Sequence, residues 1–113
     1  MQAFRIQGGT PLSGRLTVDG SKNAALPLMA ASLLSPSPIL LHGVPPLADV
    51  NNMVNLLGEL GVQIERQNRD MKLSVTDETR LHARYDIVKT MRASICTLGP
   101  MLARRGEARI SMP

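Results

Sequence analysis

Strict alternation of apolar and polar residues marks two stretches in the middle of the chain. Residues 62–65 and 71–75 place apolar side chains at every second position, and the polar residues 68–70 separate them. Successive side chains of a strand point to opposite faces, so each stretch has one apolar and one polar face. The pattern predicts a β-hairpin with one face in solvent.

The apolar positions before this hairpin follow a helical period instead. They recur at spacings of three or four residues, as on one face of an α-helix. The positions are Val50, Met53, Val54, Leu57 and Leu60. We expect Asp49 to cap the start of this helix and Gly61 to end it in the left-handed conformation.

An earlier segment is rich in Ala and Leu and predicts a second helix. Ser21 can cap it, and it extends over residues 22–34, with a bend expected at Pro27. The Ser-Pro repeat at residues 35–38 stops the helix. Residues 39–41 then predict a short buried strand.

The two ends of the chain carry shorter signals. Residues 4–7 and 15–18 read as strands separated by glycine- and proline-rich turns. Near the other end, Asp86 is expected to cap a helical region that Gly99-Pro100 interrupts. Gly106 ends this region, and residues 108–112 predict a closing strand.

A repeated order of elements emerges from these expectations. Leu33-Leu34, a stop, a strand and a proline recur 68 residues later as Met101-Leu102, a glycine stop, a strand and Pro113. Two copies of a strand–helix–strand–helix–hairpin unit, the second incomplete, would produce this order. The sequence therefore predicts an α/β fold that continues beyond the elements present.

Composition excludes several classes of protein. Phe4 and Tyr85 are the two aromatic residues, so the core must consist of Leu, Val, Ile, Ala and Met, and no stacking platform for nucleic acid is expected. The longest apolar run, residues 24–34, is shorter than the about 20 residues of a membrane span. A signal peptide is the alternative for this run, but a strand-like segment precedes it. Cys96 is the single cysteine, which excludes an internal disulfide and favours a cytoplasmic protein.

The charge pattern points to an anionic ligand. The net charge is +4, and the basic residues are scattered rather than massed in a run. Lys22 and Asn23 stand where a strand gives way to a helix, and a helix start offers free N–H groups and partial positive charge to an anion. The alternative is a solvated lysine in a loop.

A second basic pair lies near the start of the last helical region. Lys89 and Arg92 are three residues apart, so on a helix they share a face and could clamp a phosphate. A basic helix surface is the alternative. Cys96 is expected to be a buried structural thiol, because its neighbours are apolar and no His is close in sequence. No metal site is expected, since His42 and His82 stand alone.

Two long motifs carry a resemblance to a known family. Residues 8–14 with 19–27 read GGTPLSG and DGSKNAALP, and residues 85–95 with 98–100 read YDIVKTMRASI and LGP. Their order and spacing resemble the start of UDP-N-acetylglucosamine 1-carboxyvinyltransferases, within the enolpyruvyl transferase family. The resemblance extends from residue 4 to residue 113.

The resemblance implies both a reaction and a fold. The family transfers the enolpyruvyl group of phosphoenolpyruvate to the 3-hydroxyl of UDP-N-acetylglucosamine, the first committed step of peptidoglycan synthesis, without a metal or organic cofactor. It implies that Lys22, as a catalytic group, and Asn23 bind phosphoenolpyruvate, and that Arg92 contacts the UDP-sugar. The fold implied is an inside-out α/β barrel of βαβαββ units. Residues 1–21 would be leading strands that partly belong to a second domain. Residues 22–113 would hold the first unit and part of the second.

Two departures qualify the resemblance. Cys96 stands where the family commonly has Trp, and the chain ends at Pro113, before the loop that carries the family's general-acid cysteine. We therefore expect the chain to need the remainder of its own protein for activity. The alternatives are a non-catalytic anion-binding module and the sister 3-phosphoshikimate enolpyruvyl transferase.

Overall fold

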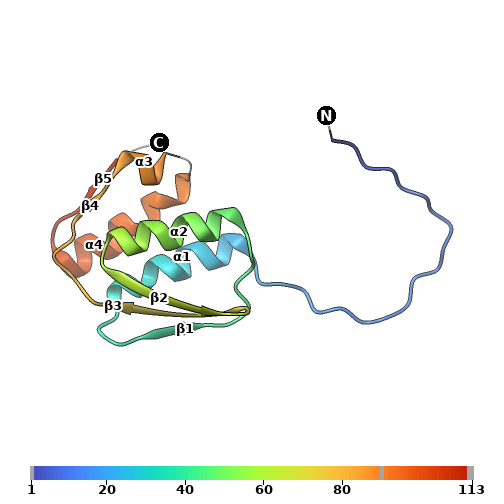
Figure 1. Ribbon diagram of the computed structural model, residues 1–113, viewed down its shortest axis with the longest axis horizontal. Coiled ribbons are helices and arrows are strands. Elements are labelled where there is room, and N and C mark those ends of the chain that lie inside the picture. Colours follow the sequence, from blue (N-terminus) through green and yellow to red (C-terminus); the bar gives the residue numbers. More distant parts are fainter. Residues whose placement is uncertain (1, 90, 112–113) are drawn as a thin grey trace.

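The computed structural model describes residues 2–89 and 91–111. Its body is a layer of helices on one side of a small sheet, followed by a second, smaller strand pair (Figure 1). The elements in chain order are α1 (Lys22–Ala31), the 3₁₀ turn η1 (Ser32–Leu34), β1 (Ile39–Leu41), α2 (Ala48–Glu59), β2 (Val62–Gln67), β3 (Asp70–Val75), β4 (His82–Ala83), α3 (Tyr85–Val88), the 3₁₀ helix η2 (Arg92–Thr97), α4 (Leu98–Arg105) and β5 (Arg109–Ile110).

The sheet has the strand order β1-β3-β2, and both pairings are antiparallel. Met71 and Leu73 of β3 are buried beneath the helices, whereas Lys72 between them is exposed. The predicted hairpin with one solvated face is therefore confirmed. The prediction of a buried strand at residues 39–41 is correct in its bounds but not in its burial. Leu40 is exposed because it points to the open face of the sheet.

Helix α2 carries the predicted apolar stripe against the core. Val50, Met53, Leu57 and Leu60 are all buried, and Gly61 follows with φ of 87°. The expected cap is wrong, because the helix begins at Ala48 and the extended residue before it is Leu47. Asp49 lies in the first turn, and its carboxylate is engaged by a side chain of another helix, as described below.

Helix α1 begins directly after Ser21, as predicted, and continues through Pro27 to Ala31. The Ser21 side chain makes no capping hydrogen bond among the described residues. At the other end, the Ser32 hydroxyl donates to the carbonyl of Met29 at 2.6 Å, and the last residues of the predicted helix form the 3₁₀ turn η1. Pro27 faces solvent, so it adds no clash with the core.

The second strand pair consists of β4 and β5, which pair in parallel. In the sequence, α3, η2 and α4 come between these two strands. The helical region expected here differs in two ways. Helix α3 already begins at Tyr85, so Asp86 lies inside it rather than capping it. The interruption falls between Val88 and Arg92 instead of at Gly99-Pro100.

Gly99 and Pro100 lie in the first turn of α4. The missing N–H of a proline is no loss there, because first-turn N–H groups have no partner within the helix. Gly106 ends α4 with φ of 75°, as predicted. The closing strand is shorter than expected, and Met112 lies outside the described residues. A parallel strand–helix–strand is how a second copy of a βα-based repeat would start.

Residues 2–20 form an extended arm that leaves the body at the start of α1 (Figure 1). The strands expected at 4–7 and 15–18 are absent from this described segment, and its apolar side chains are exposed. A strand exists through hydrogen bonds to a neighbour, and no strand of the described body lies alongside these residues. One backbone hydrogen bond, from Gly20 to the carbonyl of Gly43 at 3.1 Å, ties the arm to the body.

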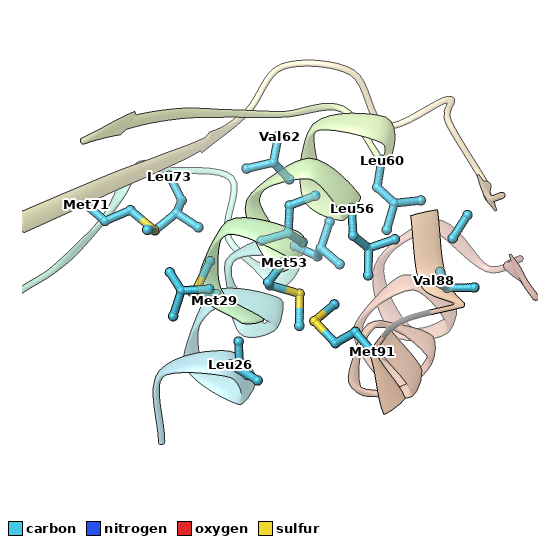
Figure 2. Packing of buried hydrophobic residues seen from close by; sticks show 14 of the residues in the cluster. Leu26, Met29, Met53, Leu56, Leu60, Val62, Met71, Leu73, Val88 and Met91 are labelled. Carbon is cyan, nitrogen blue, oxygen red and sulfur yellow. The ribbon is translucent and has the colours of Figure 1, made fainter. Parts of the chain in front are cut away.

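The core lies between the helices and the sheet and is built from aliphatic side chains and methionine, as predicted. Four of its methionines come from different helices or helix starts and are all buried: Met29, Met53, Met91 and Met101. Figure 2 shows Met91 reaching toward Met53, with Leu26 nearby. Met91 thus links the second part of the chain to the first two helices, and it places the residue after it, Arg92, beside them.

Candidate functional site

Lys22 is the first residue of α1. The preceding residue, Ser21, is extended, and the first turn of α1 contains no acidic residue. The free N–H groups of this turn carry partial positive charge, which a lysine increases and an anion reduces. Lys22 and Asn23 are both exposed. The predicted helix start is therefore present and open to solvent, and its binding of an anion stays a prediction.

The partner of Lys22 was not foreseen from the sequence. Its Nζ atom lies 3.0 Å from Oδ2 of Asp49, in the first turn of α2. Helices α1 and α2 pack side by side, and this ion pair joins their starts (Figure 1). The one sequence signal for it was an acid at a helix start, which we interpreted as a cap.

A small hollow lies next to the start of α1. Its volume is about 110 Å³, and it is bounded by the beginning of α1 and by the chain that follows β1. The lining includes Gly20, Ala24, His42 and Gly43. At Gly20 a Cβ atom would lie 2.1 Å from the carbonyl oxygen of Gly43, so only glycine fits where the arm joins the body.

The turn of the hairpin borders the same region. The carbonyl of Arg69 accepts a hydrogen bond of 2.9 Å from the N–H of Val44. The Arg69 side chain forms an ion pair with Asp19, with Nε 3.4 Å from Oδ1. His42 Nδ1 lies 2.8 Å from Asp70 Oδ1. These contacts fix the chain segments on both sides of the hollow.

Arg92 is the first residue of η2 and is exposed. Helix η2 packs against α1, and Met91 anchors its start in the core. The predicted clamp of Lys89 and Arg92 on one helical face is wrong. Lys89 lies in the turn after α3, and Met91, the residue before Arg92, is extended; Thr90 lies outside the described residues. Instead, η2, which Arg92 begins, packs against α1, which Lys22 begins.

Two groups with shifted pKa values, Arg105 and Asp77, lie away from the start of α1. Burial lowers the pKa of Arg105 in α4, an effect that the carboxylates of Glu78 and Asp77 oppose. Hydrogen bonds from Thr79 lower the pKa of Asp77. Both residues are near the C-terminal end of α2, the end away from Lys22. Their shifts reflect structural contacts rather than a second candidate site.

The comparisons with known proteins agree on one family. Residues 6–113 match the family model described as EPSP synthase (3-phosphoshikimate 1-carboxyvinyltransferase). The chain belongs to this family. It contains all of the long motifs on which the resemblance was based, and the match covers nearly its whole length.

Similar family members narrow the resemblance further. The chain is 46% identical over 113 residues to UDP-N-acetylglucosamine 1-carboxyvinyltransferase of Psychrobacter arcticus. It is 47% identical over 113 residues to the proteins of that name from Yersinia pestis and Yersinia pseudotuberculosis. In each case all of this chain is covered but only 27% of the relative, so the chain spans about a quarter of their length.

A solved structure supports the predicted fold class. The enolpyruvyl transferase NikO from Streptomyces tendae matches with a TM-score of 0.74 over 88% of this chain and 23% of that one. The sequences are 19% identical, so this likeness concerns the fold alone. The α/β fold of enolpyruvyl transferases is thus confirmed for the chain. Its division into leading strands and two repeat units remains a prediction.

Cys96, where the chain departs from the family's common Trp, lies in η2. It is half-buried rather than buried as expected. The adjoining Ser94 and Thr97 are buried, and the Thr97 hydroxyl donates to the carbonyl of Ser94 at 2.7 Å. Within residues 2–89 and 91–111, no group of three His, Cys, Asp or Glu side chains could hold a metal ion. No helix in these ranges is long and apolar enough to cross a membrane.

Proposed function

We propose that this chain forms part of the substrate site of a UDP-N-acetylglucosamine 1-carboxyvinyltransferase. The whole enzyme would transfer the enolpyruvyl group of phosphoenolpyruvate to the 3-hydroxyl of UDP-N-acetylglucosamine and release phosphate. The observation that carries this proposal is the identity of 46–47% over the full chain to proteins of that name. The proposal includes the biological setting of that reaction, peptidoglycan synthesis in the cytoplasm.

Lys22 and Asn23 are proposed to bind phosphoenolpyruvate. Lys22 combines a full positive charge with the partial charge at the start of α1, and both residues are exposed. The reaction adds the sugar hydroxyl across the double bond of phosphoenolpyruvate, with the oxygen bonding to the phosphate-bearing carbon and a proton to the methylene carbon. The adduct then loses phosphate and a methyl proton, which restores the double bond. Negative charge on the phosphate oxygens increases as the carbon–oxygen bond breaks, so a fixed cation stabilises this step. We assign that role to Lys22.

Arg92 is proposed to contact the UDP-sugar. Its guanidinium can donate two parallel hydrogen bonds to a phosphate, which a lysine cannot do. Its position at the start of η2, on a helix packed against α1, supports a site shared with Lys22. The general acid and the opposing wall of the cleft would come from the remainder of the protein, so the 113-residue chain alone should not catalyse transfer.

Phosphate release by the complete protein tests the proposal. Phosphoenolpyruvate with UDP-N-acetylglucosamine should give turnover, and phosphoenolpyruvate with shikimate 3-phosphate should give none. The opposite preference would assign the chain to the sister enzyme, and anion binding without turnover would make it a binding module. Lys22→Ala should raise the activation free energy by at least about 3 kcal/mol, with Lys72→Ala on the open sheet face as the matched control. Near-normal turnover of Lys22→Ala would remove Lys22 from the catalytic groups.

A further inference from the structure

Three acidic residues surround the start of α1, and each is paired with a different base. These pairs are Asp19 with Arg69 at 3.4 Å, Asp70 with His42 at 2.8 Å, and Asp49 with Lys22 at 3.0 Å. Asp19 is the acid nearest to Lys22 in the sequence, yet its partner is the hairpin turn. The structure thus assigns Lys22 to Asp49 alone among these three acids.

The Lys22–Asp49 pair also differs from the other two in its surroundings. Its carboxylate is the least exposed of the three, since the Asp49 side chain is 35% exposed and those of Asp19 and Asp70 are each 55% exposed. Each member belongs to the first turn of a helix, and the two helices pack together. The start of α2 favours the carboxylate, whereas the start of α1 disfavours the ammonium unless an anion is near. Asp49 supplies that negative charge.

We propose that Asp49 is a positioning residue for Lys22, an inference that rests on the proposed function. The carboxylate of Asp49 holds the Nζ atom of Lys22 at the junction of α1 and α2, so that the phosphate of the substrate meets a cation already in place. A lysine side chain has four rotatable bonds, and exposed ammonium groups seldom keep one geometry. Because α2 fixes Asp49, the ion pair restricts that freedom where the chemistry needs it.

This role predicts different effects on binding and on turnover. Removal of the charge of Asp49 releases Lys22 but also removes a negative charge close to the arriving phosphate. Affinity for the ground state should therefore change little. Transition-state stabilisation requires a cation that is already oriented, so turnover should fall. Loss of Asp49 should appear in kcat rather than in KM.

A double-mutant cycle in the complete protein tests this. Asp49→Asn should lower kcat about tenfold and leave the KM for phosphoenolpyruvate within about threefold of the wild type. In a Lys22→Met background, Asp49→Asn should have no further effect on the residual rate, because it acts through Lys22. Asp49→Glu, which keeps the charge, should restore most of kcat. Asp70→Asn makes the same change of charge without contact to Lys22 and is the matched control.

A second measurement needs no turnover. Reductive methylation of Lys22 by formaldehyde and borohydride, followed by mass spectrometry, should be severalfold faster in Asp49→Asn than in the wild type or in Asp70→Asn. Unchanged methylation, unchanged kcat, or an equal loss of kcat in both Lys22 backgrounds would overturn the role of Asp49. An inactive wild-type protein would overturn the proposed function, and with it the part of Asp49 in turnover. The methylation rates would still decide separately whether Asp49 holds Lys22.

Discussion

Nη1 of Arg105 lies 2.7 Å from the carbonyl oxygen of Leu60, at the C-terminal end of α2. The same nitrogen lies 2.7 Å from the carbonyl oxygen of Arg80, in the chain that leads to β4. Leu60 is fully buried. A guanidinium at a helix C-terminus is electrostatically favourable and satisfies carbonyls that the helix leaves free. Arg105 therefore ties the second part of the chain to the first.

Arg105→Met should lower the free energy of unfolding by about 1–3 kcal/mol, because two carbonyls lose a charged donor while the apolar stem of the side chain is kept. Arg104→Met is the control next to it. Arg104 pairs with Glu78 at 2.9 Å on the surface, and its loss should cost less than about 1 kcal/mol. Denaturant unfolding of both variants measures the difference. Equal losses would show that the buried contacts of Arg105 contribute no more than a surface ion pair.

Gly61→Ala should destabilise the fold strongly, whereas Gly58→Ala should not. Gly61 has φ of 87°, and a Cβ atom there would lie 2.0 Å from the carbonyl oxygen of Asp77. We expect a loss of more than about 2 kcal/mol from strain and from displacement of this segment. Gly58 lies inside α2 with open space around it, so alanine should stabilise by up to about 1 kcal/mol. A stable Gly61→Ala protein would contradict the close approach of Asp77.

Local patterns were sufficient to predict the elements whose partners are close in sequence. The hairpin of β2 and β3 and the buried stripe of α2 follow from periodicity, and the ends at Gly61 and Gly106 follow from the backbone freedom of glycine. These features depend on residues within a few positions of one another.

The failures concern features that distant residues decide. The strands expected at 4–7 and 15–18 have the right composition, but a strand forms only beside a partner. Pro100 was read as a break, although its position in the first turn of α4 makes it harmless. The missed partner of Lys22 has the same origin, since no periodicity links Asp49 to a residue on another helix.

For the candidate site, the sequence predicted the positions of its residues on the elements better than their arrangement in space. Lys22 and Asn23 stand at a helix start, as the motif predicted, whereas Arg92 reaches the same group of helices through the burial of Met91. Sequence spacing had paired Arg92 with Lys89 instead. Packing of η2 against α1, rather than a helical face shared with Lys89, decides where Arg92 lies.

Acid should weaken the contribution of Asp77 to stability. The side chain and N–H of Thr79 donate to its carboxylate, at contacts that include one of 2.9 Å, and they lower its pKa below the ordinary value of 3.8. A depressed folded-state pKa stabilises the protein above the unfolded pKa. That contribution is lost as the pH falls from about 3.8 through the folded pKa. Asp77→Asn should flatten the pH dependence of unfolding in this window. An unchanged acid slope would mean that these hydrogen bonds do not distinguish the folded state.

Arg92→Ala in the complete protein should weaken the binding of UDP-N-acetylglucosamine by about 1–3 kcal/mol, because a charge-assisted contact to a phosphate is lost. Arg92 is exposed at the start of η2, so the substitution removes no core packing. Arg109→Ala is a suitable control, since Arg109 is exposed on β5 and outside the proposed site. Titration calorimetry with UDP-N-acetylglucosamine, and separately with UDP alone, measures the effect. A loss of the same size for both ligands would place Arg92 on the diphosphate, and a loss for the sugar nucleotide alone would place it on the sugar. An unchanged dissociation constant for both would remove Arg92 from the site.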